Sequence, residues 1–212
     1  MAHDEAIRYS EPAEFVPVPP PALGSNLYVK DYREVKSVGA IDSTERPPDR
    51  ADVARYYAAL SPTQAMNMAA QQLSAARGDS LSENAWALAL LNMTINDAFI
   101  VSFKTKYQYN LWRPVTAIRL GDTDGNRKTD PDPLFSPFIS TPCFPSYPSN
   151  HAAGTNSGLE ILPAHLWGGR TLADDAASDP STDAALLRLE ADRRRCRRCA
   201  RLRRDSLPVR SG

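Results

Sequence analysis

The sequence predicts an all-α fold built as a bundle of helices, and three observations support this prediction. Apolar residues recur at steps of three and four along residues 81–107. Helix start and stop signals stand at the ends of the periodic segments. No segment of useful length alternates between apolar and polar residues, as a half-buried strand would. With 212 residues, of which 42% are apolar, the chain is long enough for one domain with a sizeable core.

The first part of the chain differs in composition from the rest. Residues 1–50 are rich in proline and charge, so we expect an extended N-terminal arm there. Regular patterning begins near residue 51, and residues 51–60 and 62–77 each favour a helix. Ser61 and Pro62 supply a cap and a proline at the first helical position of the second helix.

The longest helix is predicted over residues 81–107. It opens with a capping box, in which Ser80 and Glu83 can satisfy each other's backbone N–H groups. Its apolar residues fall on two sides, both expected to be buried, which favours a central place in the bundle. One side carries Trp86, Leu90, Met93, Ala98 and Val101, and the other carries Leu88, Leu91, Ile95 and Phe99.

A loop is predicted over residues 120–148, because this segment is rich in proline, glycine and aspartate. Helix is expected to resume at Ser149 and to run to about Trp167. Asp122 opens a pattern like the start of a calcium loop, but its twelfth position is Pro133 rather than glutamate, which excludes that type of site.

Charge and cysteine content limit the class of protein. The formal net charge of zero gives no overall field that favours nucleic acid or a membrane surface. Three cysteines make no disulfide framework, and no apolar run reaches the roughly 18 residues of a membrane span. The N-terminus has no signal-peptide pattern, so the chain as written is expected in the cytoplasm unless an export signal has been lost.

Two segments carry residue types suited to an oxyanion. The first is a lysine, six residues and then Arg-Pro, at Lys106, Arg113 and Pro114. Arg113 presents a planar fork of donors that matches an oxyanion, and Lys106 adds a compact positive charge. A pair of this kind is also common at a solvated helix end, with the proline simply stopping the helix.

The second segment runs from Phe144 to His151, and its last four residues, Pro148-Ser149-Asn150-His151, stand at the expected start of a helix. The Ser149 hydroxyl and the first free backbone N–H groups would face an anion there, aided by the helix dipole. His151, in the first turn, can donate a proton to a leaving oxygen, although an isolated histidine is more often structural. A cradle of this kind stabilises an oxyanion transition state without a metal cation, so no metal site is expected.

Together the two segments resemble the PAP2-type acid phosphatase and vanadium-dependent haloperoxidase superfamily, with K-x6-R-P followed by P-S-G-H. The resemblance extends over about residues 35–170, and the flanking residues are similar to the bacterial haloperoxidase-like branch. It implies an all-α bundle of that type, in which Lys106, Arg113, Ser149 and the backbone of Asn150 bind phosphate or vanadate. It also implies that His151 is the catalytic acid/base. Asn150 replaces the superfamily's glycine, and its side chain is expected to crowd the anion.

The resemblance implies one of two activities and leaves both open. A haloperoxidase would use vanadate as cofactor, with halide and peroxide as small-molecule substrates. A phosphatase would need no cofactor and would act on a phosphate ester. The same cradle holds phosphate or vanadate, so the motifs alone do not choose between them.

The superfamily's third motif, S-R-x5-H-x3-D, is missing from the chain as written. The resemblance implies that this motif supplies a second arginine and the histidine that attacks phosphorus or ligates vanadium. No histidine follows His165, and His165 itself lacks the motif's arginine and aspartate. The helical domain, residues 51–170, is therefore expected to be partial and incomplete at its C-terminal end. The chain is expected to be inactive, with residues 171–212 forming an atypical arginine-rich tail.

A shift of the reading frame by one base explains this tail. Read one base forward, the codons for residues 200–211 permit the sequence Arg-Val-Tyr-Gly-Gly-Ile-His-Phe-Arg-Phe-Asp. This is R-x5-H-x3-D, the missing motif with its spacing. We therefore hypothesise a frameshift, real or a sequencing error, between about Ala185 and Arg198.

Two other hypotheses come from different functional classes. The chain could be a non-catalytic helical binding module that has kept the fold and lost the activity. Alternatively, nine arginines between residues 193 and 210 could bind nucleic acid, and such binding would depend on salt. Cys196 and Cys199 form a lone C-x-x-C, which is weak evidence for zinc because no second ligand pair accompanies it.

Overall fold

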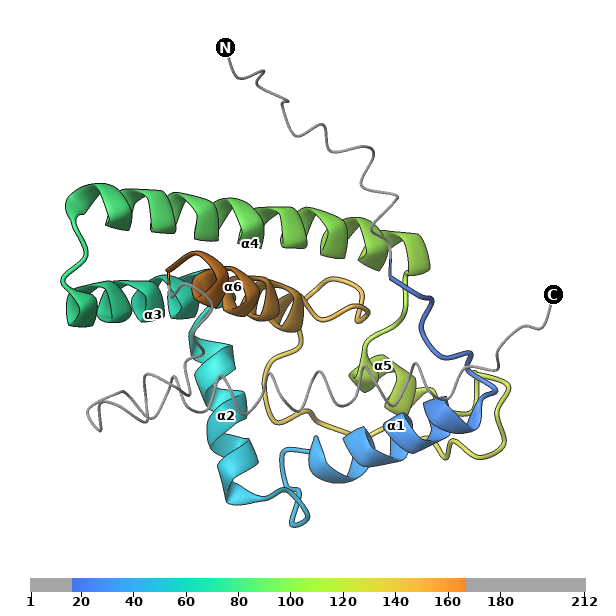
Figure 1. Cartoon of the computed structure of the whole chain (residues 1–212). Helices are drawn as coiled ribbons and strands as arrows, with labels where there is room; N and C mark the ends of the chain where they lie inside the picture. Colours follow the sequence, from blue (N-terminus) through green and yellow to red (C-terminus); the bar gives the residue numbers. More distant parts are fainter. Residues whose placement is uncertain (1–16, 167–212) are drawn as a thin grey trace. The chain divides into compact units, whose positions relative to one another are not determined.

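The computed structural model describes residues 17–166, which form six α-helices joined by loops (Figure 1). Within this range there is no strand, and extended pairing is limited to an isolated bridge between Ala40 and Pro137. The all-α prediction is therefore confirmed. The helices are α1 (Asn26–Val38), α2 (Pro48–Ala59), α3 (Pro62–Arg77), α4 (Leu81–Tyr109), α5 (Pro114–Arg119) and α6 (Asn150–Leu166).

The chain divides into two compact units. Of the described residues, 17–61 and 97–153 form the first unit, and 62–96 and 154–166 form the second. Helices α4 and α6 each contribute one end to each unit. All of the candidate site residues singled out by the sequence belong to the first unit.

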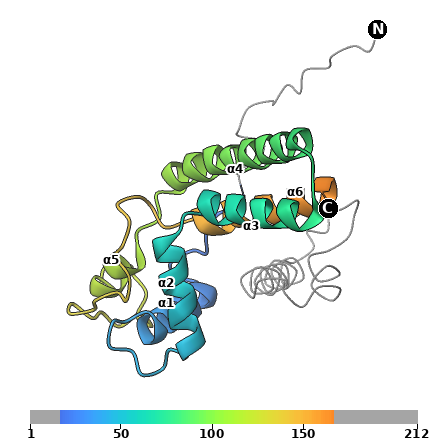
Figure 2. The same cartoon turned by 90° about the vertical axis from the view of Figure 1, so that its left-hand side faces the viewer.

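The core of the first unit lies where α1 meets α5 (Figures 1 and 2). Tyr32 of α1 donates a hydrogen bond from its hydroxyl to the carbonyl oxygen of Asp130 at 2.6 Å, which ties the long loop after α5 to this core. The cluster consists of Tyr28, Tyr32, Ile118 and Phe135, with Leu23, Val35, Ala40, Trp112 and Val115 packed around it.

Helix α1 corrects the prediction of an extended arm over residues 1–50. Ser25 caps the helix by accepting a hydrogen bond from the Tyr28 backbone N–H at 3.1 Å. Tyr28, Val29 and Tyr32 are buried on one side of the helix. The prediction gave too much weight to the prolines, which lie on both sides of the helix rather than within it, and too little to this short buried face.

In the second unit, α3 runs beside the N-terminal part of α4, and two hydrogen bonds of 2.9 Å join the Asn67 and Asn92 side-chain amides of these helices (Figures 1 and 2). The C-terminal part of α6 packs against both at Gly158. A Cβ atom there would lie 2.7 Å from the sulfur of Met66 and 3.2 Å from Leu91, so any larger residue would have to displace these buried side chains.

The two apolar sides of α4 do not share the same environment. Leu91 and Ile95, from one predicted side, are buried. Trp86 and Met93, from the other, are 53% and 65% exposed, so the prediction that they are buried is wrong. Apolar residues recur with the helical period on both sides of α4, and only the packing of neighbouring helices determines which side is buried.

Among the described residues, the segment Leu81–Arg119, which contains α4 and α5, has the length and apolar composition of a membrane span, whereas the sequence predicted none. Length and composition alone are weak evidence, since helices of soluble proteins meet the same criteria. Asp97 and Lys104 lie within the stretch, and charged side chains are costly in a bilayer.

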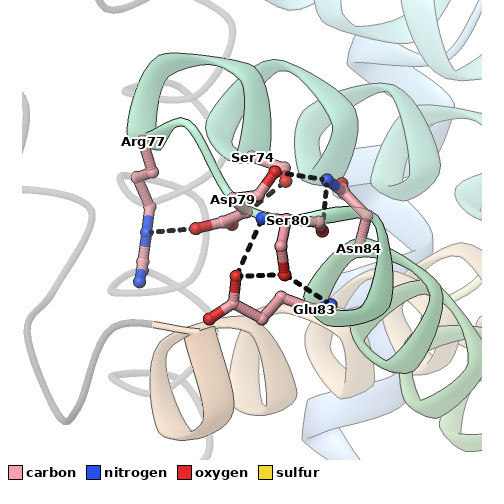
Figure 3. A network of polar contacts seen from close by, with 6 residues as sticks. All are labelled: Ser74, Arg77, Asp79, Ser80, Glu83 and Asn84. Carbon is pink, nitrogen blue, oxygen red and sulfur yellow. Dashed lines mark hydrogen bonds and ion pairs between the residues drawn. The ribbon is translucent and has the colours of Figure 1, made fainter.

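The turn between α3 and α4 is held by the predicted capping box (Figure 3). Glu83 accepts hydrogen bonds from the Ser80 backbone N–H at 2.8 Å and from the Ser80 hydroxyl at 2.6 Å. The Glu83 N–H donates in return to Ser80 Oγ at 3.3 Å. Beside it, Asp79 accepts from the Ser74 hydroxyl at 3.0 Å and pairs with Arg77 at 3.3 Å.

Replacing Ser80 with alanine should lower the free energy of unfolding by about 1 kcal/mol, because the cap of α4 is lost. Urea denaturation followed by circular dichroism measures the change. Ser140→Ala, in an exposed loop, is the control and should change stability by less than about 0.5 kcal/mol. Equal stability of the Ser80 variant and the parent would show that the capping box contributes nothing to α4.

Candidate functional site

The structure brings the two motif segments together in the first unit. Lys106, near the C-terminal end of α4, reaches the loop that precedes α6 and is 1% exposed. Its Nζ donates to the carbonyl oxygens of Pro145 at 2.8 Å, Ser146 at 3.1 Å and Pro148. A lysine ammonium has three N–H groups, so these carbonyls occupy all of them. Lys106 therefore connects the end of α4 to the loop before α6, two segments that are far apart in the sequence, and holds this loop in place.

Burial, with a smaller contribution from the charge of Arg113, lowers the pKa of Lys106 to about 8. The carbonyl contacts stabilise the charged form because they accept hydrogen bonds from the ammonium. The charge of Lys106 is thus present at neutral pH and is lost in the alkaline range.

Arg113 stands immediately before α5, at the N-cap position. Its Nε donates a hydrogen bond to the carbonyl oxygen of Phe144, and its guanidinium carbon lies 4.6 Å from the centre of the Phe144 ring. Lys106 Nζ lies 5.0 Å from the centre of the same ring, so one aromatic ring contacts both cations. Burial lowers the pKa of Arg113, although a guanidinium remains charged in proteins.

One atom of Arg113 stands out. Its Nη2 is buried and has no hydrogen-bond partner among the residues that the structure describes. An unpaired buried donor on a cation is costly, whereas an anion that accepted from it would form a strong charge-assisted bond. Arg113 thus keeps one side of its fork for a further acceptor.

Ser149 lies at the start of α6, as the sequence predicted. Its Oγ accepts a hydrogen bond from the Ala152 backbone N–H at 3.2 Å, and its carbonyl oxygen accepts from Ala153 at 3.0 Å. The side chain is exposed, so the first turn of the helix meets solvent here. The positive end of the helix dipole and the first N–H groups favour an anion at this position.

Asn150 and His151 lie in the first turn of α6 and have different environments. Asn150 Oδ1 accepts a hydrogen bond from the hydroxyl of Ser102 at 2.7 Å. His151 is exposed, and its ring lies 5.9 Å from the Tyr57 ring of α2 at an interplanar angle of 82°. The exposed imidazole is accessible to a ligand at the helix start.

Sequence reasoning missed Ser102, Tyr57 and Phe144. Ser102 carried a usable signal, because it lies four residues before Lys106 and so faces the same way on α4. Phe144 opens the second predicted segment but was assigned no role, and nothing in the sequence near Tyr57 pointed to His151.

Several predictions lie outside the described residues. These are the arginine-rich tail, Cys196 and Cys199, the hypothesised frameshift and the loss of the third motif. The side chain of His165 is likewise outside the described part. Within residues 17–166, no group of three His, Cys, Asp or Glu side chains is arranged to hold a metal ion.

Comparison with known proteins gives one consistent result. Residues 87–185 match the family model of the VCPO second helical-bundle domain. The chain is similar to the vanadium chloroperoxidase of Curvularia inaequalis, with 26% identity in an alignment 211 residues long that covers 83% of this chain and 34% of the relative.

A solved structure described as the first bacterial vanadium-dependent iodoperoxidase is also similar. Its TM-score is 0.59 at 25% identity, over 72% of this chain and 38% of that one. This chain thus spans about a third of the length of either relative. The three comparisons agree with each other and with the two spaced motifs, and together they support the haloperoxidase-like PAP2 superfamily.

Proposed function

We propose that this chain carries the oxyanion cradle of a vanadium-haloperoxidase-like protein and binds vanadate, or phosphate in its place. The buried, unpaired Nη2 of Arg113 carries this proposal, because it is a cationic donor that lacks an acceptor. The relatives named as vanadium peroxidases favour vanadate over phosphate as the resident anion, with halide and peroxide as substrates.

Each residue has a distinct part in this proposal. Arg113 donates to one anion oxygen, and Ser149 with the first N–H groups of α6 donates to others. His151, exposed in the same turn, moves a proton to or from a bound oxygen. The N–H groups of Lys106 hold the loop, and its positive charge acts on the anion through the field it creates.

Bound vanadate would supply a Lewis acid that activates peroxide toward halide. In the superfamily this needs the histidine of the third motif, which the chain as written lacks. We therefore propose that the chain binds the anion without turnover, and that the other reading frame restores the missing histidine.

Calorimetric titration of the protein with orthovanadate at pH 7 tests the proposal. Saturable binding at one site per chain, competed by phosphate, is the expected result. Neither oxidation of halide by peroxide nor hydrolysis of a chromogenic phosphate ester should accompany it. The nucleotide sequence across codons 180–212 tests the frameshift separately. Absence of vanadate and phosphate binding by the folded protein would refute the cradle.

A further inference from the structure

Two residues of α4 hold the two neighbours of Ser149. Ser102 and Lys106 are one helical turn apart, and they are 2% and 1% exposed. The Ser102 hydroxyl donates to Asn150 Oδ1 at 2.7 Å, and Lys106 Nζ donates to the carbonyl oxygen of Pro148. Ser149 therefore lies between two residues, Pro148 and Asn150, that are both hydrogen-bonded to α4.

The hydrogen bond from Ser102 gives a role to Asn150, which stands where the superfamily has glycine. A side chain in place of glycine was expected to crowd the anion. The structure instead engages the Asn150 amide oxygen with the buried face of α4, whereas Ser149 and His151 on either side of it are exposed. Glycine could not form this contact, because it has no side-chain acceptor.

We propose that Ser102 is a positioning residue for the anion site, and that Asn150 is the link through which it acts. The hydrogen bond between them fixes the first turn of α6, so that Ser149 and the free N–H groups are held in place before an anion arrives. Preorganised donors lose less conformational entropy on binding than mobile ones. This inference rests on the proposed function, since it assigns a role in the same cradle.

The experiment measures vanadate affinity by calorimetry for Ser102→Ala, Asn150→Gly and the double variant. Each single change should weaken binding about threefold to tenfold, the effect of one hydrogen bond. The double variant should bind no more weakly than Asn150→Gly alone, because the serine acts only through the asparagine.

Thr105→Val is the matched control. Thr105 is buried on the same helix, but its hydroxyl bonds to the carbonyl oxygen of Val101 within α4, at 2.7 Å. Its replacement should lower stability without changing vanadate affinity. Equal loss of affinity in the Ser102 and Thr105 variants would show that Ser102 has a general structural role, and would overturn the inference. Additive losses in the double variant would overturn it as well.

Amide hydrogen exchange of the anion-free protein separates this inference from the proposed function. Ser102→Ala should speed exchange at Ala152 and Ala153, whose N–H groups are bonded to Ser149, and Thr105→Val should leave it unchanged. A parent protein that binds no vanadate refutes the proposed function, whatever the exchange shows. A parent that binds vanadate, with unchanged exchange and affinity in Ser102→Ala, refutes the positioning role alone.

Discussion

Replacing Arg113 with alanine should weaken vanadate or phosphate binding by about 1.5–3 kcal/mol, or roughly tenfold to 150-fold. The variant loses a charge-assisted contact from the one buried cationic donor that has no other acceptor among the described residues. Calorimetric titration of the parent and the variant measures the difference. Arg113→Lys should fall between them, because it keeps the charge and loses the planar fork.

Arg127→Ala is the control for this experiment, since Arg127 is an exposed arginine of the same unit. Its effect on affinity should be small and should diminish at high salt. Equal anion affinity in the parent and in Arg113→Ala would remove Arg113 from the cradle, and with it the main support for the proposed function.

Replacing Lys106 with methionine should lower the free energy of unfolding by about 3 kcal/mol. Three carbonyl groups of the loop before α6 lose their donor, and a buried acceptor left unpaired costs about 1–3 kcal/mol. Removal of a buried charge offsets part of this loss. Urea denaturation measures the change, and Lys104→Met, at an exposed position two residues earlier, should have less than about 0.5 kcal/mol of effect. A Lys106 variant as stable as the parent would mean that these contacts do not hold the loop.

The pKa of Lys106 gives this residue a pH signature. In the unfolded chain the lysine should titrate near its ordinary pKa of 10.5, whereas in the folded protein its pKa is about 8. Between these values the unfolded state binds more protons, so stability should rise as pH increases from about 8 to about 10.5. This contribution should disappear in Lys106→Met. Sulfate, whose charge is constant over this range, should bind less tightly above pH 8 because the site loses a positive charge.

The sequence by itself determined the boundaries of α3, α4 and α6 to within two residues, together with the composition of the candidate cradle, whereas α1 and α5 were not predicted. The capping box at Ser80 and Glu83 begins α4 as predicted, and α3 begins at Pro62 and ends before Gly78. Ser149 precedes α6, again as predicted. These signals work because capping and turn formation depend on residues only a few positions apart.

Tertiary structure decided everything that depends on distant segments. Residues 26–38 form a helix, α1, that buries one of its faces. The packing of neighbouring helices also determines which of the two apolar sides of α4 is buried. The fold also places three carbonyl oxygens within hydrogen-bonding distance of Lys106 Nζ, and it brings Asn150 within hydrogen-bonding distance of Ser102. A buried polar group must find a partner, and packing determines which partner is within reach. The sequence therefore specifies that Lys106 is a cation, while the fold specifies which acceptors surround it.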